Sequence, residues 1–481
     1  MTASRRFSHQ DQLDFAALSG DANPLHVDAV MARRSHVGSQ VVHGVHLLLW
    51  GLEQILSREG GEMSLAAVKV RFVKPVELER PVALHSVEIT PGAARWQLLG
   101  SGDGQVLQAE VLWQPLSQEG LVKAGEAGLF PGVAPGVAMD RDLSSCAGWS
   151  HALALPLDCE AARRMFPVLM SRLPAWQVAL LLATTRVVGM ECPGLYSLYS
   201  ELNLDPMPAC WPAEGFQVRC SSVRAALSLV TLELTGGGMQ GRIRAFRRQP
   251  PVGQASFAAL AHAVPRGRFA ARRVLLVGGS RGLGEVAAKL LAAGGARVCL
   301  TWRLGQQDAR RVVDEINSGG GDATALSLDV NDPESLKSLR DRWPWWPDAL
   351  GYFATPIIAR ADKQRPIDME ELARLNACYV GGFIHLVTRL REGGNGMLQV
   401  LYPSSIYVTD PPQGLWEYSL AKAAGEQACA LLRGAGVSIH APRWPLMVTD
   451  QSVGILPSQG QQTVQVLTEA LTAAFSQVAT P

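Results

Sequence analysis

The stretch RRVLLVGGSRGLGEVAAKLLAAGGARVCLTWR, Arg272 to Arg303, decides the fold of the C-terminal part of the chain. An apolar run leads through a glycine-rich loop into a helix-like pattern, and a second apolar run follows. We expect a strand, a turn, a helix and a second strand parallel to the first. Similar apolar runs follow at ATALSLDV, ALGYFAT and GMLQVLYPSS. Residues 263–481 are therefore predicted to form an α/β domain with a doubly wound parallel sheet.

The glycine-rich loop of this stretch predicts a dinucleotide site. Gly278, Gly282 and Gly284 allow a tight turn and a close approach of the backbone to a pyrophosphate at the helix N-terminus. A cofactor with a free 2′-hydroxyl would need an acidic residue about 20 residues later. The chain has Arg303 there and Arg281 inside the loop, which favours NADPH, unless both arginines are solvated surface charges.

A tyrosine and a lysine in LWEYSLAKAAGEQACALL predict a proton donor. Tyr418 and Lys422 are one helical turn apart and share a face. An ammonium beside a phenol favours the phenolate, so we expect Lys422 to lower the pKa of Tyr418. The tyrosine could then protonate a carbonyl oxygen as hydride arrives. Ser404 and Ser405 end the preceding strand, where a serine could bind the same oxygen.

Residues 270–450 resemble the short-chain dehydrogenases/reductases, and the resemblance implies a Rossmann-like fold. It implies catalytic roles for Ser405, Tyr418 and Lys422, and a structural asparagine at Asn376 in RLNACYVGGF. The implied cofactor contacts are Gly278, Ser280, Arg281, Gly282, Leu283, Gly284, Arg303, Asp329, Val330 and Lys422.

The chain departs from this family's pattern at three places near the cofactor site. Val277 stands where threonine usually opens the glycine motif, FATP (353–356) replaces an N-A-G motif, and His440 replaces an asparagine. The departures concern the fine geometry of cofactor binding and leave the serine, tyrosine and lysine in place.

The N-terminal segment, residues 1–118, has the pattern of a sheet wrapped around a helix. A short helix is predicted in QDQLDFAALSG, and VVHGVHLLLWGLEQIL (41–56) is apolar nearly all round, as a buried helix should be. Apolar residues then alternate with polar ones, as in VKVRF (68–72), which predicts antiparallel strands. This order predicts an α+β domain.

Residues 119–262 repeat this plan weakly. The apolar helix AWQVALLLATTRVVG follows the helical stretch DCEAARRMFPVLMSRL, and alternating strands come after it. A second N-P-x-H sequence is missing. We therefore expect a duplicated fold whose second copy is degenerate.

The sequence LSGDANPLH, residues 18–26, is either a polar turn after a helix or an acid/base pair on a rigid loop. Together with VVHGVHLLL it resembles the (R)-specific enoyl thioester hydratases, the MaoC-like branch of the hotdog fold, over residues 7–115. The resemblance implies a double hotdog for the first two segments, with Asp21 and His26 as the catalytic pair. The Gly44 amide, at the start of the long helix, could polarise a thioester carbonyl. Which of Asp21 and His26 is the acid stays open.

Other conspicuous residues are given structural roles. His43 is predicted to be structural, and His36 and His46 to be surface and packing residues. The tryptophans of RWPWWPD (342–348) are expected to pack against the core, with an exposed protein-binding patch as the alternative.

The composition narrows the functional classes. A formal net charge of +1 gives no electrostatic reason to expect nucleic acid or an anionic membrane as a partner. The eight cysteines have no metal-binding spacing, so no metal is expected, and they suggest a reducing compartment. Without an apolar signal segment, we expect a cytoplasmic protein.

The two predicted chemistries are consecutive. A reductase converts a 3-ketoacyl thioester to the 3-hydroxyacyl thioester, and a dehydratase converts that to the trans-2-enoyl thioester. The sequence thus predicts a bifunctional enzyme of fatty acid or polyketide-type biosynthesis, acting on thioesters of acyl carrier protein or coenzyme A, and a possible homo-oligomer. Three alternatives stay open. The chain could work in the oxidative direction, or only one module could be active, with the dehydratase favoured over the reductase. The chain could also be a non-catalytic docking partner of a synthase.

Overall fold

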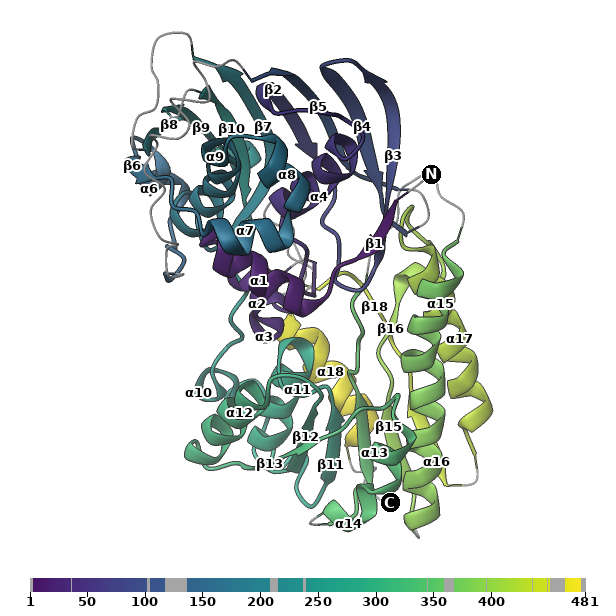
Figure 1. Cartoon of the computed structure of the whole chain (residues 1–481). Coiled ribbons are helices and arrows are strands. Elements are labelled where there is room, and N and C mark those ends of the chain that lie inside the picture. Colours follow the sequence, from purple (N-terminus) through teal and green to yellow (C-terminus); the bar gives the residue numbers. More distant parts are fainter. Residues whose placement is uncertain are drawn as a thin grey trace. The chain divides into compact units, whose positions relative to one another are not determined.

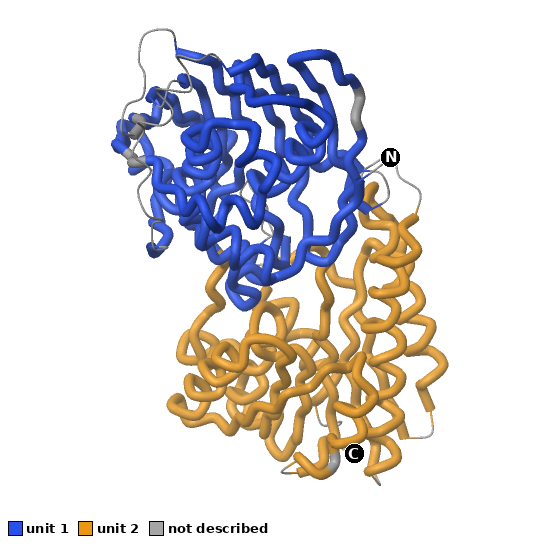
Figure 2. The backbone as a smooth tube through the Cα atoms, viewed as in Figure 1, with its two compact units in different colours: residues 1–250, 454–457 blue, residues 251–453, 458–481 orange. Residues whose placement is uncertain are grey.

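The computed structural model describes residues 3–476, except 36, 102–103, 117–135, 208–214, 237–238, 344, 359–366, 395, 435, 448 and 450–462. The chain forms two compact units, residues 1–250 with 454–457 and residues 251–453 with 458–481 (Figure 2). The sequence pattern divides the chain into three domains, with boundaries after residues 118 and 262, and this division stays a prediction. In the part of the chain that is described, no helix is long and apolar enough to cross a membrane.

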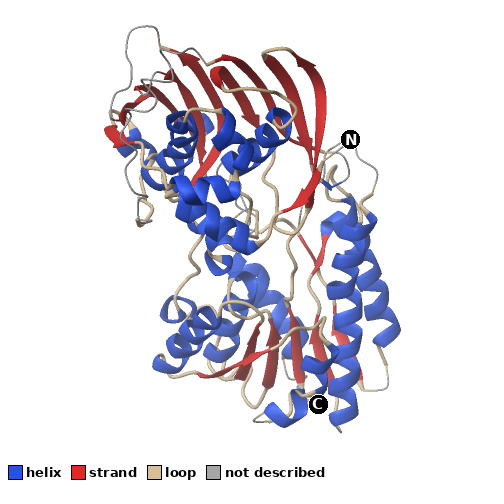
Figure 3. Ribbon diagram, in the orientation of Figure 1, coloured by secondary structure: helices blue, strands red, loops and turns tan. Residues whose placement is uncertain are grey.

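The described part of the first unit contains a ten-stranded sheet (Figure 3). In spatial order its strands are β1 (Ser4–Arg6), β3 (Pro81–Thr90), β4 (Ala93–Leu99), β5 (Gln105–Pro115), β2 (Met63–Phe72), β7 (Ser197–Pro206), β10 (Met239–Arg247), β9 (Leu229–Gly236), β8 (Gly215–Arg224) and β6 (Ser150–Ala154). All neighbouring strands are antiparallel.

The two halves of this sheet have the same strand order, reversed about its centre. In each half a long apolar helix, α4 (Gly44–Leu56) or α9 (Ala175–Arg186), is followed by four strands of the sheet. The first strands after the helices, β2 and β7, pair at the centre of the sheet, with Val68 opposite Leu204. Both helices lie on one face of the sheet (Figure 1) and share one hydrophobic core with it. Burial against a common sheet explains why both helices are apolar nearly all round.

Short helices precede each long helix. The first half has α1 (His9–Ser19), α2 (Pro24–Val27) and α3 (Ala29–Ala32); the second has α6 (Leu143–Cys146), α7 (Cys159–Met165) and α8 (Pro167–Arg172). A π-helical turn, η2 (Val187–Glu191), extends α9, and a short 3-10 turn, η3 (Ala225–Leu227), joins β8 to β9. Both α2 and α8 begin with a proline, and when these prolines are aligned RMFPVL (164–169) stands in the second half where DANPLH stands in the first.

The second unit is built on a parallel sheet, as predicted. Its order is β13 (Asp322–Ser327), β12 (Arg297–Trp302), β11 (Arg273–Val277), β14 (Ala349–Tyr352), β15 (Leu398–Leu401) and β17 (Val437–His440). Two short strands, β16 (Ser404–Ser405) and β18 (Arg443–Trp444), pair separately. The helices are α10 (Phe257–Leu260), α11 (Gly282–Ala293), α12 (Gln306–Ser318), α13 (Pro333–Lys337), α14 (Leu339–Arg342), α15 (Met369–Asn376), α16 (Phe383–Gly393), α17 (Trp416–Leu432) and α18 (Thr463–Phe475), with η4 (Ala377–Gly382) and η5 (Ile406–Val408).

Alternate residues of β11 serve two cores. Val274 and Leu276 pack with α11, α12 and α18, whereas Leu275 and Val277 pack with α16 and α17. A strand buried on both faces needs an unbroken apolar run, which is what residues 274–277 supply. This arrangement confirms the Rossmann-like, doubly wound expectation.

The tryptophan cluster of the second unit is structural. Trp343, Trp345 and Trp346 pack against the core between the sheet and α16, and Nε1 of Trp346 donates to the Leu390 carbonyl at 3.0 Å. These contacts confirm the packing interpretation.

Candidate active sites

The DANPLH segment forms the first turn of a helix. Helix α1 ends at Gly20, whose φ of 75° is left-handed, and the chain then turns into α2. Asn23 caps α2, because its side-chain oxygen accepts a hydrogen bond from the Leu25 amide at 3.0 Å. Pro24 occupies the first position, where its missing amide hydrogen costs nothing. His26 therefore projects from a short helix that the asparagine and proline define.

Asp21 is buried, with 1% of its surface exposed. Its Oδ2 accepts a 2.6 Å hydrogen bond from the Thr185 hydroxyl, and its Oδ1 accepts one from the Asn23 amide at 3.2 Å. Burial raises the pKa of Asp21 to about 6, against the opposing effect of these two hydrogen bonds. Asp21 therefore holds a proton closer to neutral pH than an ordinary aspartate does.

Burial shifts the pKa of His26 in the opposite direction to that of Asp21. Its Nδ1 lies 2.8 Å from the Val41 carbonyl oxygen, so Nδ1 carries the hydrogen and Nε2 keeps its lone pair. Burial lowers the pKa of His26 to about 4, and the Arg248 guanidinium contributes in the same direction. A neutral imidazole with an unprotonated Nε2 can accept a proton.

The second half of the first unit holds this segment in place. The Asn23 amide group donates to the carbonyl of Gly189 at 2.8 Å, and the carbonyls of Gly194 and Leu195 lie at 3.3 Å. A Cβ on Gly189 would lie 2.2 Å from Oδ1 of Asp21, so only glycine fits there. Thr185 and Gly189 belong to α9 and its π-helical extension, and the sequence alone did not identify them.

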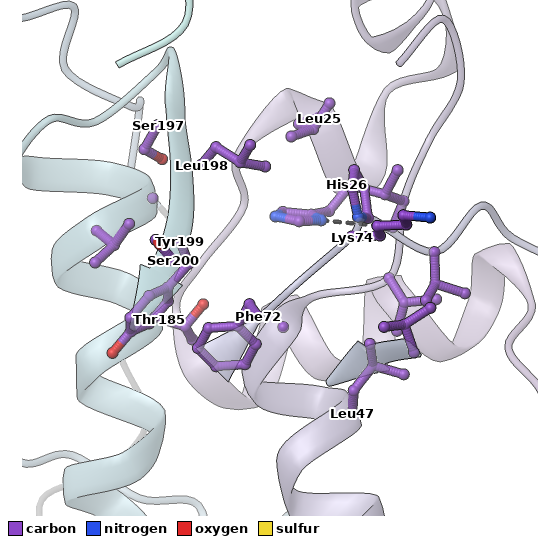
Figure 4. Close-up of a pocket in the computed structure, with 18 of the residues that line it drawn as sticks. Leu25, His26, Leu47, Phe72, Lys74, Thr185, Ser197, Leu198, Tyr199 and Ser200 are labelled. Carbon is purple, nitrogen blue, oxygen red and sulfur yellow. Dashed lines mark hydrogen bonds between the residues drawn. The ribbon is translucent and has the colours of Figure 1, made fainter. Parts of the chain in front are cut away.

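Asp21, His26 and Gly44 line one pocket. Figure 4 shows His26 among the residues that line it. Gly44 is the first residue of α4, where amide groups lack intrahelical partners. The pocket also takes residues from the second half, including Thr185, Leu198 and Tyr199, and encloses about 160 Å³. An acid, a base and a helix N-terminus therefore face one apolar cavity.

The neighbouring histidines have structural roles. Both ring nitrogens of His43 are engaged, with Oε1 of Gln12 at 3.0 Å and the Asp21 carbonyl oxygen at 2.9 Å, and its ring stacks on His26 at 3.8 Å. His46 is buried and stacks on Phe15 at 4.5 Å. His36 lies outside the described residues. Asp21, His26 and His43 offer ligand atoms within 4.8 Å of one another, but the hydrogen bonds of His43 assign it to the frame of the site.

The glycine loop of the second unit is so tightly packed that two of its glycines have no room for a side chain. Gly278 has a φ of 78°, and a Cβ there would lie 2.9 Å from the Phe353 carbonyl oxygen. A Cβ on Gly284 would lie 2.2 Å from the Gly278 carbonyl oxygen. Gly282 begins α11, and Arg281 is its N-cap. The glycines therefore allow a tight turn into the start of α11, and the role of this loop, with Ser280 and Leu283, as a pyrophosphate site stays a prediction.

Two charged residues lie at the ends of neighbouring strands. Arg303 follows β12, and its guanidinium lies 3.9 Å from the carboxylate of Asp329, which follows β13. The Arg303 side chain is 56% exposed and so remains accessible to a ligand. Asp329 and the buried Val330 come directly before α13. Their role as adenosine contacts stays a prediction.

The serine, tyrosine and lysine converge as predicted. The Ser405 hydroxyl lowers the pKa of Tyr418 by hydrogen bonding, and the Lys422 ammonium is 5.9 Å from the tyrosine ring centroid. Ser404 is engaged elsewhere, because it donates to Glu426 at 2.5 Å. Burial nevertheless raises the pKa of Tyr418 to about 12. The expected net lowering of this pKa is therefore wrong, because desolvation of the phenolate outweighs the hydrogen bond from Ser405.

Lys422 is enclosed by aromatic rings. Its ammonium donates to the Pro403 carbonyl at 2.8 Å and lies 3.9 Å from the ring centroid of Tyr379 and 5.2 Å from that of Tyr402. Burial lowers the pKa of Lys422 to about 8. Cation–π attraction offsets part of the desolvation of such a cation. Tyr379 is thus a contact of Lys422 that the sequence analysis missed.

Asn376 is the last residue of α15, where the helix continues into the π-helical turn η4. Its buried side-chain oxygen has no hydrogen-bond partner among the described residues. The carbonyls of Cys378 and Tyr379 in η4 accept hydrogen bonds from the hydroxyls of Tyr352 and Tyr402, at 2.7 and 3.0 Å. The role of Asn376 stays a prediction.

Comparison with known families matches both ends of the chain. Residues 2–88 match the family model described as MaoC like domain, and residues 272–343 match the model described as short chain dehydrogenase.

Several reductases are similar to the second unit. Versicolorin reductase stcU of Emericella nidulans is 36% identical over 75 residues, covering 16% of this chain and 28% of that protein. Elsinochrome reductase 1 of Elsinoe fawcettii is 37% identical over 97 residues, covering 20% and 34%. The chain thus spans about a third of the length of these relatives. Among solved structures, a short chain dehydrogenase from Burkholderia cenocepacia in complex with NADP is 25% identical, with a TM-score of 0.35 covering 38% of this chain and 78% of that one.

Proposed function

We propose that this chain, which carries a MaoC-like domain in its first unit and a short-chain dehydrogenase domain in its second, reduces 3-ketoacyl thioesters with NADPH and dehydrates the product. The observation that carries the proposal is the pairing of the buried Asp21 with a neutral His26 on one pocket, in a chain that also brings together Ser405, Tyr418 and Lys422.

Dehydration follows from the protonation states of the pair. His26 Nε2 takes the α-proton of a 3-hydroxyacyl thioester, and protonated Asp21 gives its proton to the departing hydroxyl, so that water leaves and the double bond forms. The Gly44 amide donates to the thioester oxygen, where negative charge develops as the α-proton leaves. A proton then returns from the imidazolium to the carboxylate through solvent.

Reduction uses Ser405, Tyr418 and Lys422 of the second unit. The residues from Gly278 to Gly284 would hold NADPH, which would supply a hydride to the ketone carbon. Tyr418 gives a proton to the ketone oxygen, Ser405 holds that oxygen by a hydrogen bond, and Lys422 supports the phenolate that remains. Arg303 and Arg281 are the residues we assign to the 2′-phosphate, and the loop from Gly278 to Gly284 would hold the pyrophosphate.

We also propose that the first unit is a double hotdog whose second copy is degenerate. The reversed strand order about the β2–β7 pair supports two copies. In the second copy, Phe166, Pro167 and Leu169 stand where Asn23, Pro24 and His26 stand in the first. The acid/base function would then belong to the first copy, with the second contributing Thr185 and the carbonyl groups that fix Asn23.

The substrates and partners follow from this chemistry. We propose thioesters of acyl carrier protein or coenzyme A, in fatty acid or polyketide-type biosynthesis, and no nucleic acid or membrane partner. Activity of the dehydratase alone is the second candidate, because Val277 and residues 353–356 depart from the reductase pattern. A docking role has less support, because the tryptophan cluster is packed against the core.

Separate assays test the two activities. Hydration of a trans-2-enoyl thioester, followed by loss of ultraviolet absorbance, measures the first unit, and NADPH oxidation with a 3-ketoacyl thioester measures the second. Both rates should be well above background. Hydration without NADPH binding would leave the dehydratase as the function of the chain.

A further inference from the structure

Two aromatic rings in contact with each other line the pocket of the first unit. Phe72 ends β2 and Tyr199 lies on β7, and their ring centroids are 4.7 Å apart with the planes tilted by 50°. Figure 4 shows both rings among the residues that line the pocket. We call this pair the aromatic wall.

The aromatic wall stands directly beside the reacting groups. A Cβ on Gly44 would lie 2.9 Å from Cδ1 of Phe72, so the ring packs against the start of α4. At the other end, Tyr199 lines the same pocket as Thr185 of α9, and its buried hydroxyl has no hydrogen-bond partner among the described residues. The wall therefore packs against the start of α4, which carries Gly44, and faces the pocket that Thr185, the hydrogen-bond partner of Asp21, also lines.

The cavity in front of the wall is small and apolar. It encloses about 160 Å³, and its apolar lining includes Leu25, Leu47, Val106, Val188, Leu198 and Phe246. An engineered cavity of about 150 Å³ in another protein binds benzene, a six-carbon ligand. A thioester carbonyl placed at the Gly44 amide would leave room for an acyl group of about that size.

We propose that the aromatic wall restricts the dehydratase to thioesters of short acyl chains, about four to six carbons long. This inference rests on the proposed dehydratase function. A longer chain would have to displace Phe72 or Tyr199, whose rings pack against each other, and Phe72 also packs against the start of α4. Phe72 and Tyr199 are then residues that determine specificity without taking part in proton transfer.

The test is a chain-length series of trans-2-enoyl-coenzyme A substrates with four, six, eight, ten and twelve carbons. The parent protein should hydrate the four- and six-carbon substrates with kcat/KM at least about tenfold above the ten-carbon one, since misfit in a pocket costs about tenfold or more. Phe72→Ala should raise kcat/KM for ten carbons about tenfold, and Tyr199→Leu should act in the same direction.

The matched control is Leu112→Ala on β5, an apolar side chain that is 40% exposed and outside the pocket. It should keep the parent's chain-length profile. Thermal unfolding checks that each variant is folded, and Phe72→Leu replaces Phe72→Ala if the latter is not. Equal kcat/KM values for the four- and ten-carbon substrates in the parent protein would overturn the proposed role of the aromatic wall. They would leave the proposed dehydratase function standing. No hydration at any length would instead overturn the proposed function.

Discussion

Thr185 donates a 2.6 Å hydrogen bond from its hydroxyl to the carboxylate of Asp21, across 164 residues of sequence. The bond joins the two halves of the ten-stranded sheet at the reacting acid. A carboxylate that accepts a hydrogen bond is stabilised in its charged form, so Thr185 lowers the pKa of Asp21 against burial. The second half of the first unit therefore helps to set the protonation state of Asp21 in the first half.

This relationship predicts the pH dependence of hydration. The reaction needs one proton on the Asp21–His26 pair, which the pair holds between the pKa of His26, about 4, and that of Asp21, about 6. The kcat/KM should therefore fall above pH 6 and below pH 4. Thr185→Val removes the donor, which raises the pKa of Asp21, so the alkaline limit should move to higher pH. An unchanged alkaline limit in this variant would contradict the assignment of that limit to Asp21.

Asp21→Asn keeps the shape of the side chain and removes the titrating group. Hydration should fall by roughly 10²–10⁴, as for loss of a general acid. NADPH-dependent reduction should persist and serves as the internal control. If DANPLH were only a turn, asparagine would serve as well as aspartate, and the variant would keep its hydration rate.

The same variant should alter stability with a defined sign. Asp21 binds its proton more tightly in the folded state, so its favourable contribution is complete below pH 3.8 and is lost as pH rises through about 6. Asp21→Asn should therefore be more stable than the parent at pH 7, by up to about 3 kcal/mol, and the difference should shrink toward pH 4. Denaturant unfolding at both pH values measures it, and a variant that is less stable at pH 7 would argue against a costly buried carboxylate.

Tyr379 is predicted to keep Lys422 charged. Tyr379→Leu removes the ring 3.9 Å from the ammonium, a contact worth about 2 kcal/mol when desolvated, so the pKa of Lys422 should fall by about 1.5 units from about 8. The alkaline limit of reduction should move down accordingly, while NADPH binding, followed by fluorescence, is retained. Tyr379→Phe keeps the ring and should resemble the parent; a shift in Tyr379→Phe as large as in Tyr379→Leu would exclude cation–π attraction as the cause.

Arg303 is predicted to select NADPH. Its exposed guanidinium can bind a 2′-phosphate, whereas Arg303→Asp would repel the phosphate and could accept from a free 2′-hydroxyl. The ratio of kcat/KM for NADPH to that for NADH should narrow or reverse in this variant. Equal kcat/KM values for NADPH and NADH in the parent protein would contradict the selection of NADPH by Arg303.

The sequence predicted the elements whose patterns are local. The apolar run Val274–Val277 is buried on both faces, and the spacing of Tyr418 and Lys422 places them on one helix with Ser405 nearby. Asp21, His26 and Gly44 come together because the short α2 and the start of α4 are adjacent in the fold.

Contacts between distant segments escaped the sequence analysis. Thr185 and Gly189 look like ordinary members of an apolar helix, and only the pairing of β2 with β7 brings the second half against Asp21. The pKa of Tyr418 was mispredicted for a similar reason, since the spacing to Lys422 is visible in the sequence but the burial of the phenol is not. Phe72 belonged to a correctly predicted strand, yet its contact with Tyr199 depends on the neighbouring half.

The most direct test of a two-step enzyme uses the full chain with a 3-ketobutyryl thioester and excess NADPH, and follows the products by mass over time. We expect the mass of the thioester to increase as the 3-hydroxy intermediate forms, and then to decrease by loss of water as the trans-2-enoyl product forms. In Tyr418→Phe both products should nearly disappear, because loss of the proton donor should cost roughly 10²–10⁴ in rate, while a supplied 3-hydroxybutyryl thioester is still dehydrated. An unchanged 3-ketobutyryl thioester in the presence of the parent protein and NADPH would contradict the central claim.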